Sequence, residues 1–161
     1  MYSIGDKVVY PMYGAGIIES IEEQEFQGIV NQYYVMKMPM GDMKVMIPML
    51  NAEKIGIRDV IDDKEADKVI SEFAALEAEC EHSWNKRYRE NMLKIKGGDI
   101  YEVATVVKTL MCRDKTKGLS TGEKKMLTNA KQILVSELVL AKNIAQEEIE
   151  RMFTEALREQ E

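Results

Sequence analysis

The chain changes its hydrophobic periodicity near residue 60, and this change constrains the fold more than any other feature of the sequence. Before it, apolar residues stand in short or alternating runs rich in Val, Ile and Tyr, a pattern typical of strands. The runs cover residues 6–10, 15–21, 31–38 and 43–47. Turn residues such as Pro11, Gly28 and Gly41 separate them. Residues 1–60 are therefore predicted to form a small antiparallel β barrel of the Tudor or SH3-like type.

After residue 60, apolar residues recur at helical spacing and the helix starts carry capping signals. At each start an N-cap side chain precedes a carboxylate by three residues, so that both can satisfy unpaired N–H groups of the first turn. The pairs are Asp62 with Glu65, Asp99 with Glu102, and Ser120 with Glu123. Residues 61–161 are thus predicted to form a compact all-α bundle of four or five helices, and the chain is assigned to the α+β class.

Length and the absence of targeting signals limit the function classes. A chain of 161 residues holds one or two small domains, which excludes a large multidomain enzyme. No apolar run approaches the ~18 residues that cross a bilayer, and the first residues lack a secretory signal. We therefore expect a cytoplasmic protein without membrane contact. The cysteines Cys80 and Cys112 lie 32 positions apart with no C-x-x-C motif, and we expect reduced thiols.

Charge is distributed unevenly along the sequence. The net charge of −6 argues against a nucleic-acid partner, because phosphate binding depends on Lys and Arg. Residues 82–131, however, hold 12 basic and 5 acidic side chains, and acidic segments flank them on both sides. Such a block is a local electrostatic footprint for phosphate. The alternative is an ordinary solvated helical surface.

Catalytic constellations are hard to assemble from these residues. The single histidine, His82, excludes any mechanism that needs two imidazoles, and the chain has neither a P-loop nor a G-x-G-x-x-G motif. Cys80 and His82 supply two metal ligands, whereas a structural zinc requires four. No carboxylate pair can be told apart from a capping pair. We therefore expect no enzyme activity, no cofactor, no metal and no small-molecule substrate.

The only tryptophan, Trp84, lies beside the cations Lys86, Arg87 and Arg89. Cations neutralise phosphate, while an aromatic ring can enter a groove or stack on a base. With Ser83 as N-cap, Trp84 is the first helical residue and can project past the helix end. The alternative is that Trp84 belongs to the core or forms a hydrophobic staple.

A second predicted helix start adds two further cations. Lys124 and Lys125 follow Ser120, where free backbone N–H groups also attract phosphate. If the two helix starts converge on one face of the protein, they form a binding surface.

The predicted sheet needs a different partner, because it is acidic overall, and eight of the twelve methionines lie before residue 50. Alternation along the fourth run puts Val45 and Ile47 on the core face and Lys44 and Met46 on the other. Exposed methionine suits a protein-contact surface. The alternative is that the methionines fill the core, a choice that the pattern leaves open for Met36 and Met38.

Motifs in both halves of the chain resemble one protein family. They are Gly5 to Pro11, Gly14-Ala15-Gly16 and residues 45–48, then Trp84 to Tyr88, Gly98-Asp99, Arg113-Asp114 and residues 118–127 running into 130–134. This set resembles the CarD/CdnL family of bacterial transcription regulators. The first domain of that family is similar to the polymerase-interacting domain of transcription-repair coupling factors. The resemblance covers nearly the whole chain.

The resemblance implies that the Tudor-like domain, residues 1–60, binds the β subunit of bacterial RNA polymerase. It implies that the helical domain, residues 61–161, contacts promoter DNA at the upstream edge of the melted region, with Trp84 wedged into the minor groove. The DNA-binding candidates are Trp84, Lys86, Arg87, Arg89, Lys124 and Lys125, and the polymerase-binding candidates are Gln24, Lys44, Met46 and Pro48.

Two of these positions depart from the family pattern. The family often has an arginine where this chain has Met46 and another cation where it has Gln24. Charge pairing with the polymerase is therefore expected to be weaker, and an apolar contact through Met46 fits its predicted place on the outer face.

Together these features predict a transcription initiation regulator that performs no chemistry. It would bind the open promoter complex more tightly than the closed one and would reach the nucleoid through RNA polymerase. The alternative is an adaptor whose helical bundle binds another protein and whose basic segment is ordinary solvated surface.

Overall fold

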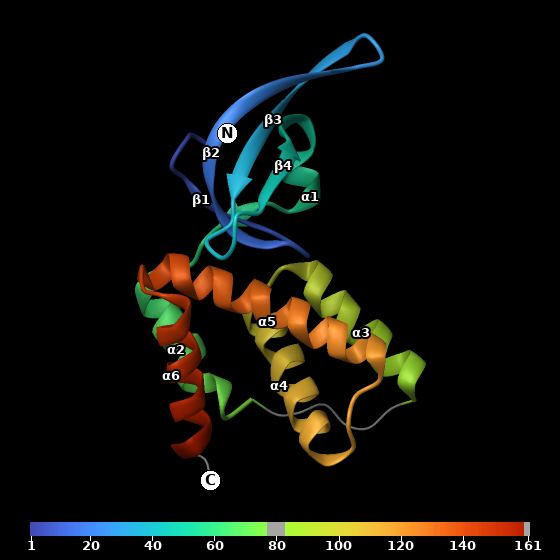
Figure 1. Cartoon of the computed structure of the whole chain (residues 1–161), viewed down its shortest axis with the longest axis vertical. Helices are drawn as coiled ribbons and strands as arrows, with labels where there is room; N and C mark the ends of the chain where they lie inside the picture. Colours follow the sequence, from blue (N-terminus) through green and yellow to red (C-terminus); the bar gives the residue numbers. More distant parts are fainter. Residues whose placement is uncertain (77–82, 160–161) are drawn as a thin grey trace.

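The computed structural model describes residues 1–76 and 83–159 and confirms the predicted α+β class. The sheet forms one half of the molecule and the long helices form the other (Figure 1). The strands are β1 Lys7–Tyr10, β2 Gly14–Phe26, β3 Ile29–Lys37, β4 Lys44–Pro48 and β5 Arg58–Asp59. All pairings are antiparallel, in the order β4-β3-β2-β1-β5. This order leaves β4 at one edge of the sheet.

The β2–β3 hairpin is longer than the sequence pattern predicts and projects beyond the rest of the sheet (Figure 1). Residues 21–30 are exposed on both faces of the hairpin. The alternation that marks a half-buried strand is therefore missing there. Gln27 and Gly28, at the tip, have φ values of 53° and 79°. Positive φ at both central residues is what a two-residue type I′ turn requires.

One face of the sheet is packed into a hydrophobic core. The prediction for β4 is confirmed, because Ile47 is fully buried and Met46 is 39% exposed. Met36 and Met38 are both buried, so these two methionines fill the core rather than face a partner. The buried members of this cluster are Val8, Ile18, Tyr34, Met36, Met38, Ile47, Ala52 and Ile57.

Beyond β4 the chain forms a short turn and a short helix that the pattern does not predict, η1 (Met49–Asn51) and α1 (Ala52–Ile55). Five longer helices follow in the described part of the chain, as predicted. They are α2 Asp63–Phe73, α3 Trp84–Gly97, α4 Ile100–Thr116, α5 Thr121–Lys142 and α6 Gln146–Glu159. None of the described helices has the length and apolar character needed to cross a bilayer.

The predicted N-caps are all in place. The side chain of Asp62 accepts a hydrogen bond from the Glu65 N–H, that of Asp99 from Tyr101 and Glu102, and that of Ser120 from Glu123. These bonds satisfy N–H groups that the first helical turn leaves without a partner. The caps therefore fix where each helix begins.

Helix α5 crosses the helical half directly beneath the sheet and packs against both β2 and α4 (Figure 1). Ala130, Leu134 and Leu138 belong to the helical core, and none of them is more than 1% exposed. Near its C-terminal end, Leu140 shares a separate buried cluster with Val9 and Ala15 of the sheet. One helix thus contributes to the cores on both sides of the junction.

Candidate nucleic-acid interface

Trp84 is the first residue of α3 and stands at the surface. The hydroxyl of Ser83 caps the helix and accepts a hydrogen bond from the Lys86 N–H at 3.4 Å. The indole is 43% exposed. The expectation that Trp84 is the first helical residue and is exposed is confirmed, and the alternative of a buried core tryptophan is wrong.

Two contacts hold the indole in one orientation. Its ring stacks on Tyr88, one turn further along α3, with a centroid distance of 5.1 Å and an interplanar angle of 18°. Its Nε1–H donates to the hydroxyl of Ser120 at 2.9 Å. Tyr88 in turn packs against the helical core. The indole therefore lies over the joint between the starts of α3 and α5, as the idea of two converging helix starts predicts.

Behind the indole is a buried ion pair. Glu123 is 1% exposed and accepts hydrogen bonds from Arg87, through Nε at 2.8 Å and Nη2 at 3.1 Å. The Ser120 hydroxyl also donates to Glu123, at 3.1 Å. The Arg87 hydrogen bond holds the pKa of the Glu123 carboxyl below its usual range, against the opposing effect of burial. A continuous chain of polar contacts therefore connects Trp84 to Arg87.

This network changes the expected roles of two features. Arg87 is only 17% exposed and is directed to Glu123, so its contact with the DNA backbone stays a prediction. Ser120 and Glu123 form a reciprocal capping box. The box uses two of the N–H groups at the start of α5, and this leaves a weaker phosphate site there than the sequence suggested.

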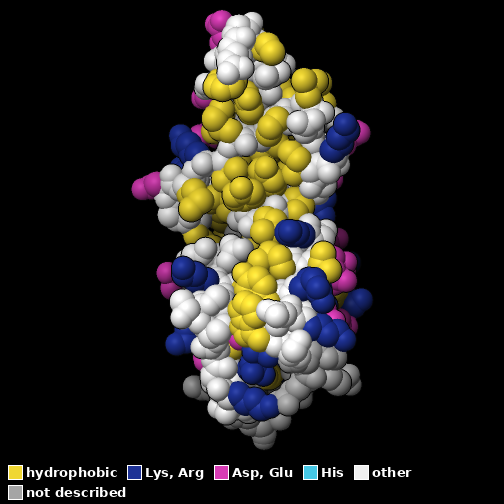
Figure 2. All heavy atoms as spheres, turned by 90° about the vertical axis from the view of Figure 1, so that its right-hand side faces the viewer, with side chains coloured by type: hydrophobic (Ala, Val, Ile, Leu, Met, Phe, Trp, Pro, Cys, Tyr) yellow, Lys and Arg dark blue, Asp and Glu magenta, His cyan; other side chains and the backbone are white. Residues whose placement is uncertain are grey.

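The remaining cations of the two helix starts are exposed to solvent. Lys86 and Arg89 on α3 and Lys124 and Lys125 on α5 are all exposed. On the face seen in Figure 2, Lys and Arg side chains flank an apolar strip on the helical half. Exposed cations on the same two helix starts as an exposed aromatic ring suit an anionic polymer with exposed bases or grooves.

The four polymerase-binding candidates share one face of the sheet. Lys44, Met46 and Pro48 alternate along β4 and therefore point to the same side. Their cross-strand partners on β3 are Lys37, Val35 and Tyr33. Asn31 precedes Tyr33 by the same two-residue spacing on β3 and pairs with Gln24 on β2, which places Gln24 on the same side of the sheet. The ammonium group of Lys44 lies 2.9 Å from the Glu19 carboxylate, and this hydrogen bond raises the pKa of Lys44.

Sequence reasoning missed Ser120 as the partner of the indole and Glu123 as the centre of the network. The capping box was visible as a pattern, but the contact with Trp84 depends on how α3 and α5 approach each other. Leu93 on α3, which is 62% exposed, was also missed.

Metal-ligating side chains do not gather in the part of the chain that the structure describes. No group of three or more His, Cys, Asp or Glu residues there could hold an ion. Cys80 and His82 lie outside the described residues. Cys112 is a free, half-buried thiol.

These features define a class of protein in which a small β domain, with apolar side chains at its surface, is docked on a helical bundle that exposes an aromatic ring among cations. Two family models match the chain, the CarD-like/TRCF RID domain over residues 2–61 and the CarD C-terminal domain over residues 68–154. The first match agrees with the predicted Tudor-like domain.

The chain is also similar to the Bacillus subtilis (strain 168) protein named "Putative transcription factor YdeB". The two are 45% identical over 149 residues, which cover 92% of this chain and 97% of the relative. The chain therefore belongs to the CarD family, and the resemblance inferred from its motifs is confirmed. A role in transcription regulation follows from this membership.

Proposed function

We propose that the protein regulates transcription initiation by binding RNA polymerase through the sheet and promoter DNA through the helices. Residues 1–60 form the polymerase-binding unit, directed at the β subunit, and residues 61–161 form the DNA-binding unit. The protein performs no chemistry and uses no cofactor. It acts in the cytoplasm, at the nucleoid, wherever RNA polymerase holds a promoter.

Surface hydrophobicity supports the polymerase contact. Among the described residues, eleven of the thirteen exposed large hydrophobic side chains lie in the first 50 residues. Concentrated exposed apolar surface marks protein-contact sites. Strand β4 adds an edge of the sheet, where backbone N–H and C=O groups can pair with a strand of another chain. Met46 stands on this edge and offers an adaptable apolar contact.

The observation that carries the DNA contact is the fixed and half-exposed indole of Trp84. An aromatic wedge must enter between base pairs, and the unstacking costs a few kcal/mol per step. At the edge of a transcription bubble that cost has already been met. Because Tyr88 and Ser120 hold the ring in place, little side-chain freedom is lost when the ring inserts.

The proposed mechanism is a shift of the equilibrium between closed and open promoter complexes. A ligand shifts an equilibrium only by its difference in affinity for the two states. If the wedge favours open DNA by about 1.4 kcal/mol, the ratio of open to closed complexes changes about tenfold. Attachment to the polymerase raises the local concentration of the DNA-binding unit, so neither contact needs to be tight alone.

The test is the lifetime of open complexes formed by bacterial RNA polymerase with the wild-type protein and with Trp84→Ala. The wild type should lengthen the lifetime, and Trp84→Ala should not, while it still binds polymerase. Leu93→Ala is the matched control, because it removes another exposed apolar side chain from the same helix. Equal lifetimes with wild type and Trp84→Ala would remove the wedge from the mechanism.

A further inference from the structure

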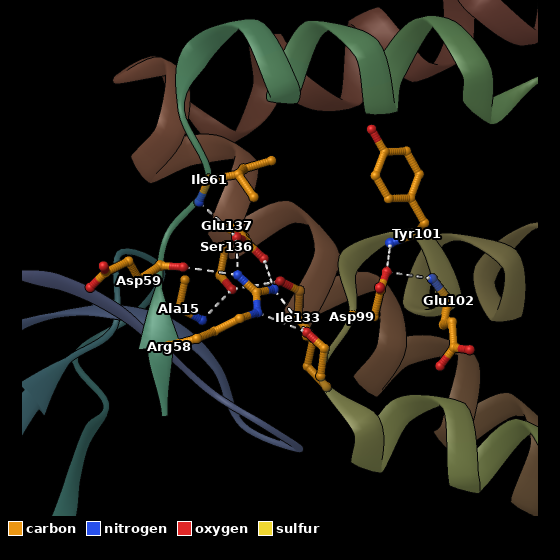
Figure 3. Close-up of polar contacts among 11 residues, drawn as sticks. Ala15, Arg58, Asp59, Ile61, Asp99, Tyr101, Glu102, Ile133, Ser136 and Glu137 are labelled. Carbon is orange, nitrogen blue, oxygen red and sulfur yellow. Dashed lines mark hydrogen bonds and ion pairs between the residues drawn. The ribbon is translucent and has the colours of Figure 1, made fainter. Parts of the chain in front are cut away.

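Arg58 joins the sheet to the two helices that carry the candidate interface. It lies on β5 and its guanidinium is directed toward α5 and the turn between α3 and α4 (Figure 3). Nη1 donates to Glu137 Oε2 at 2.7 Å and to the Asp59 carbonyl at 3.0 Å. Nη2 donates to Glu137 Oε1 at 2.7 Å and to the Gly98 carbonyl at 2.8 Å, and Nε donates to the same carbonyl at 3.0 Å. All five guanidinium N–H groups are thereby used.

Glu137, near the C-terminal end of α5, is buried at this junction, with its side chain 3% exposed. Besides the two bonds from Arg58, it accepts the Ile61 N–H at 3.0 Å. Polar bonds continue along the same helix. Ser136 accepts the Ala15 N–H at 2.9 Å, and the Lys7 ammonium group donates to the Leu140 carbonyl at 3.0 Å. The sheet is therefore joined to one stretch of α5 by several directional bonds.

The C-terminal end of α3 is held at the same place. Gly98 caps α3 with φ of 79°, and a Cβ there would lie 3.0 Å from Pro11 Cγ. Glycine therefore permits the end of α3 to approach the sheet closely. The Gly98 carbonyl at this end accepts the hydrogen bonds from Arg58 Nε and Nη2.

The junction and the indole lie at opposite ends of the same two helices. Trp84 begins α3, roughly 20 Å from the end that Gly98 caps, at 1.5 Å per residue. Ser120 caps the start of α5, roughly 25 Å from Glu137 on the same measure. The two helix starts meet at the hydrogen bond between Trp84 and Ser120. In Figure 1, α3 and α5 run side by side between these two ends.

We propose that Arg58 and Glu137 are positioning residues that hold the sheet and the Trp84 ring in one fixed relation. This inference rests on the proposed function, because it concerns how a protein attached to polymerase presents the ring to DNA. A second contact benefits from a tether only if the geometry allows both contacts at once. A rigid junction also removes the orientational freedom that a hinged molecule would lose on binding. Arginine suits this role because its planar fork fixes direction as well as charge.

The first test uses the free protein and needs neither DNA nor polymerase. Small-angle X-ray scattering is compared for wild type, Arg58→Met and Arg151→Met. Arg151 is the matched control because its ion pairs are exposed and stay within α6. Arg58→Met should give a larger radius of gyration than wild type, with helix content preserved by circular dichroism, and Arg151→Met should scatter like wild type. An unchanged radius for Arg58→Met would overturn the proposal.

The second test measures how much protein is needed to lengthen the life of open complexes. Arg58→Met should need about tenfold more protein than wild type, while its separate affinities for polymerase and for forked DNA change less than about twofold. Arg58→Lys keeps the charge, guards against misfolding and should fall between the two. A loss of separate DNA or polymerase affinity that accounts for the whole effect would overturn the positioning role. If the wild type itself leaves open-complex lifetimes unchanged, the proposed function fails. The scattering experiment still tests whether Arg58 holds the sheet and the helices in one fixed relation.

Discussion

Replacing Glu123 by glutamine tests the network behind the indole. Glu123 is 1% exposed and accepts two hydrogen bonds from Arg87 and one from the Ser120 hydroxyl. Glu123→Gln keeps the shape of the side chain but removes its charge. Arg87, which is 17% exposed, then faces a neutral amide in place of this carboxylate. We expect Glu123→Gln to destabilise the fold and to loosen the start of α5.

The magnitude follows from the burial of the pair. Breaking a buried pair by removing one partner costs about 3–5 kcal/mol. Water can still reach part of Arg87, and an amide oxygen can accept one of its hydrogen bonds, so we expect about 2–3 kcal/mol. For a chain of 161 residues, this corresponds to a lowering of the melting temperature by about 4–12 °C.

The assay is unfolding followed by circular dichroism, in urea and on heating, with Glu148→Gln as the control. Glu148 pairs with Arg151 on the surface of α6, where both side chains are largely exposed. Exposed pairs contribute little, so the control should unfold like wild type. If Glu123→Gln also unfolds like wild type, the buried pair does not stabilise the protein as argued.

The dependence on pH provides an independent check. The Arg87 hydrogen bond lowers the pKa of Glu123 in the folded protein. The stabilisation is therefore fully present above the unfolded carboxyl pKa of about 4.3 and is lost as pH falls through the folded value. The difference in unfolding free energy between wild type and Glu123→Gln should be full at neutral pH and shrink in acid. A difference that does not change with pH would contradict this account.

Three further predictions concern the two binding faces and the junction. Lys86→Glu and Lys124→Glu should weaken binding to forked DNA and make its affinity depend less steeply on salt concentration, whereas the control Lys64→Glu, on α2, should do neither. If the salt dependence of the first two variants equals that of wild type, these lysines do not contact phosphate. Met46→Asp should weaken binding to polymerase in a pull-down, because it replaces an exposed apolar side chain on the outer face of β4 by a charge. Undiminished capture would move the interface elsewhere. Gly14→Ala should lower the free energy of unfolding by about 2 kcal/mol, because φ is +114° and the new Cβ would lie 2.8 Å from Ser136 Oγ. Gly5→Ala, where φ is also positive but the space around the Cβ is open, should cost less in the same unfolding assay.

Local patterns were enough to predict the secondary structure of most of the chain. Capping pairs mark helix starts because a side chain and a backbone N–H only three residues apart must meet, as they do at Asp62, Asp99 and Ser120. Alternation along β4 correctly separated its buried residues from its exposed ones, because one face of this strand is buried. The pattern failed on the outer part of the β2–β3 hairpin, where neither face is buried and no alternation is imposed.

The exposure of Trp84 could be predicted from the Ser83 cap, but the chemistry behind it could not. The contacts of the indole with Ser120 and of Arg87 with Glu123 join residues 36 positions apart. Arg58 and Glu137 are 79 positions apart. Nothing in the local sequence distinguishes these charged residues from solvated ones, because their partners are chosen by the packing of α3 and α5 against each other and against the sheet.

The stacking of the single tryptophan on Tyr88 has a practical consequence. Because the chain contains one tryptophan, and that ring is half-exposed at the candidate interface, its fluorescence comes from this one place. Any partner that covers the indole, or between whose bases the indole inserts, should change its fluorescence emission directly. The unlabelled protein therefore contains its own optical reporter of occupancy, positioned where the proposed DNA contact would occur.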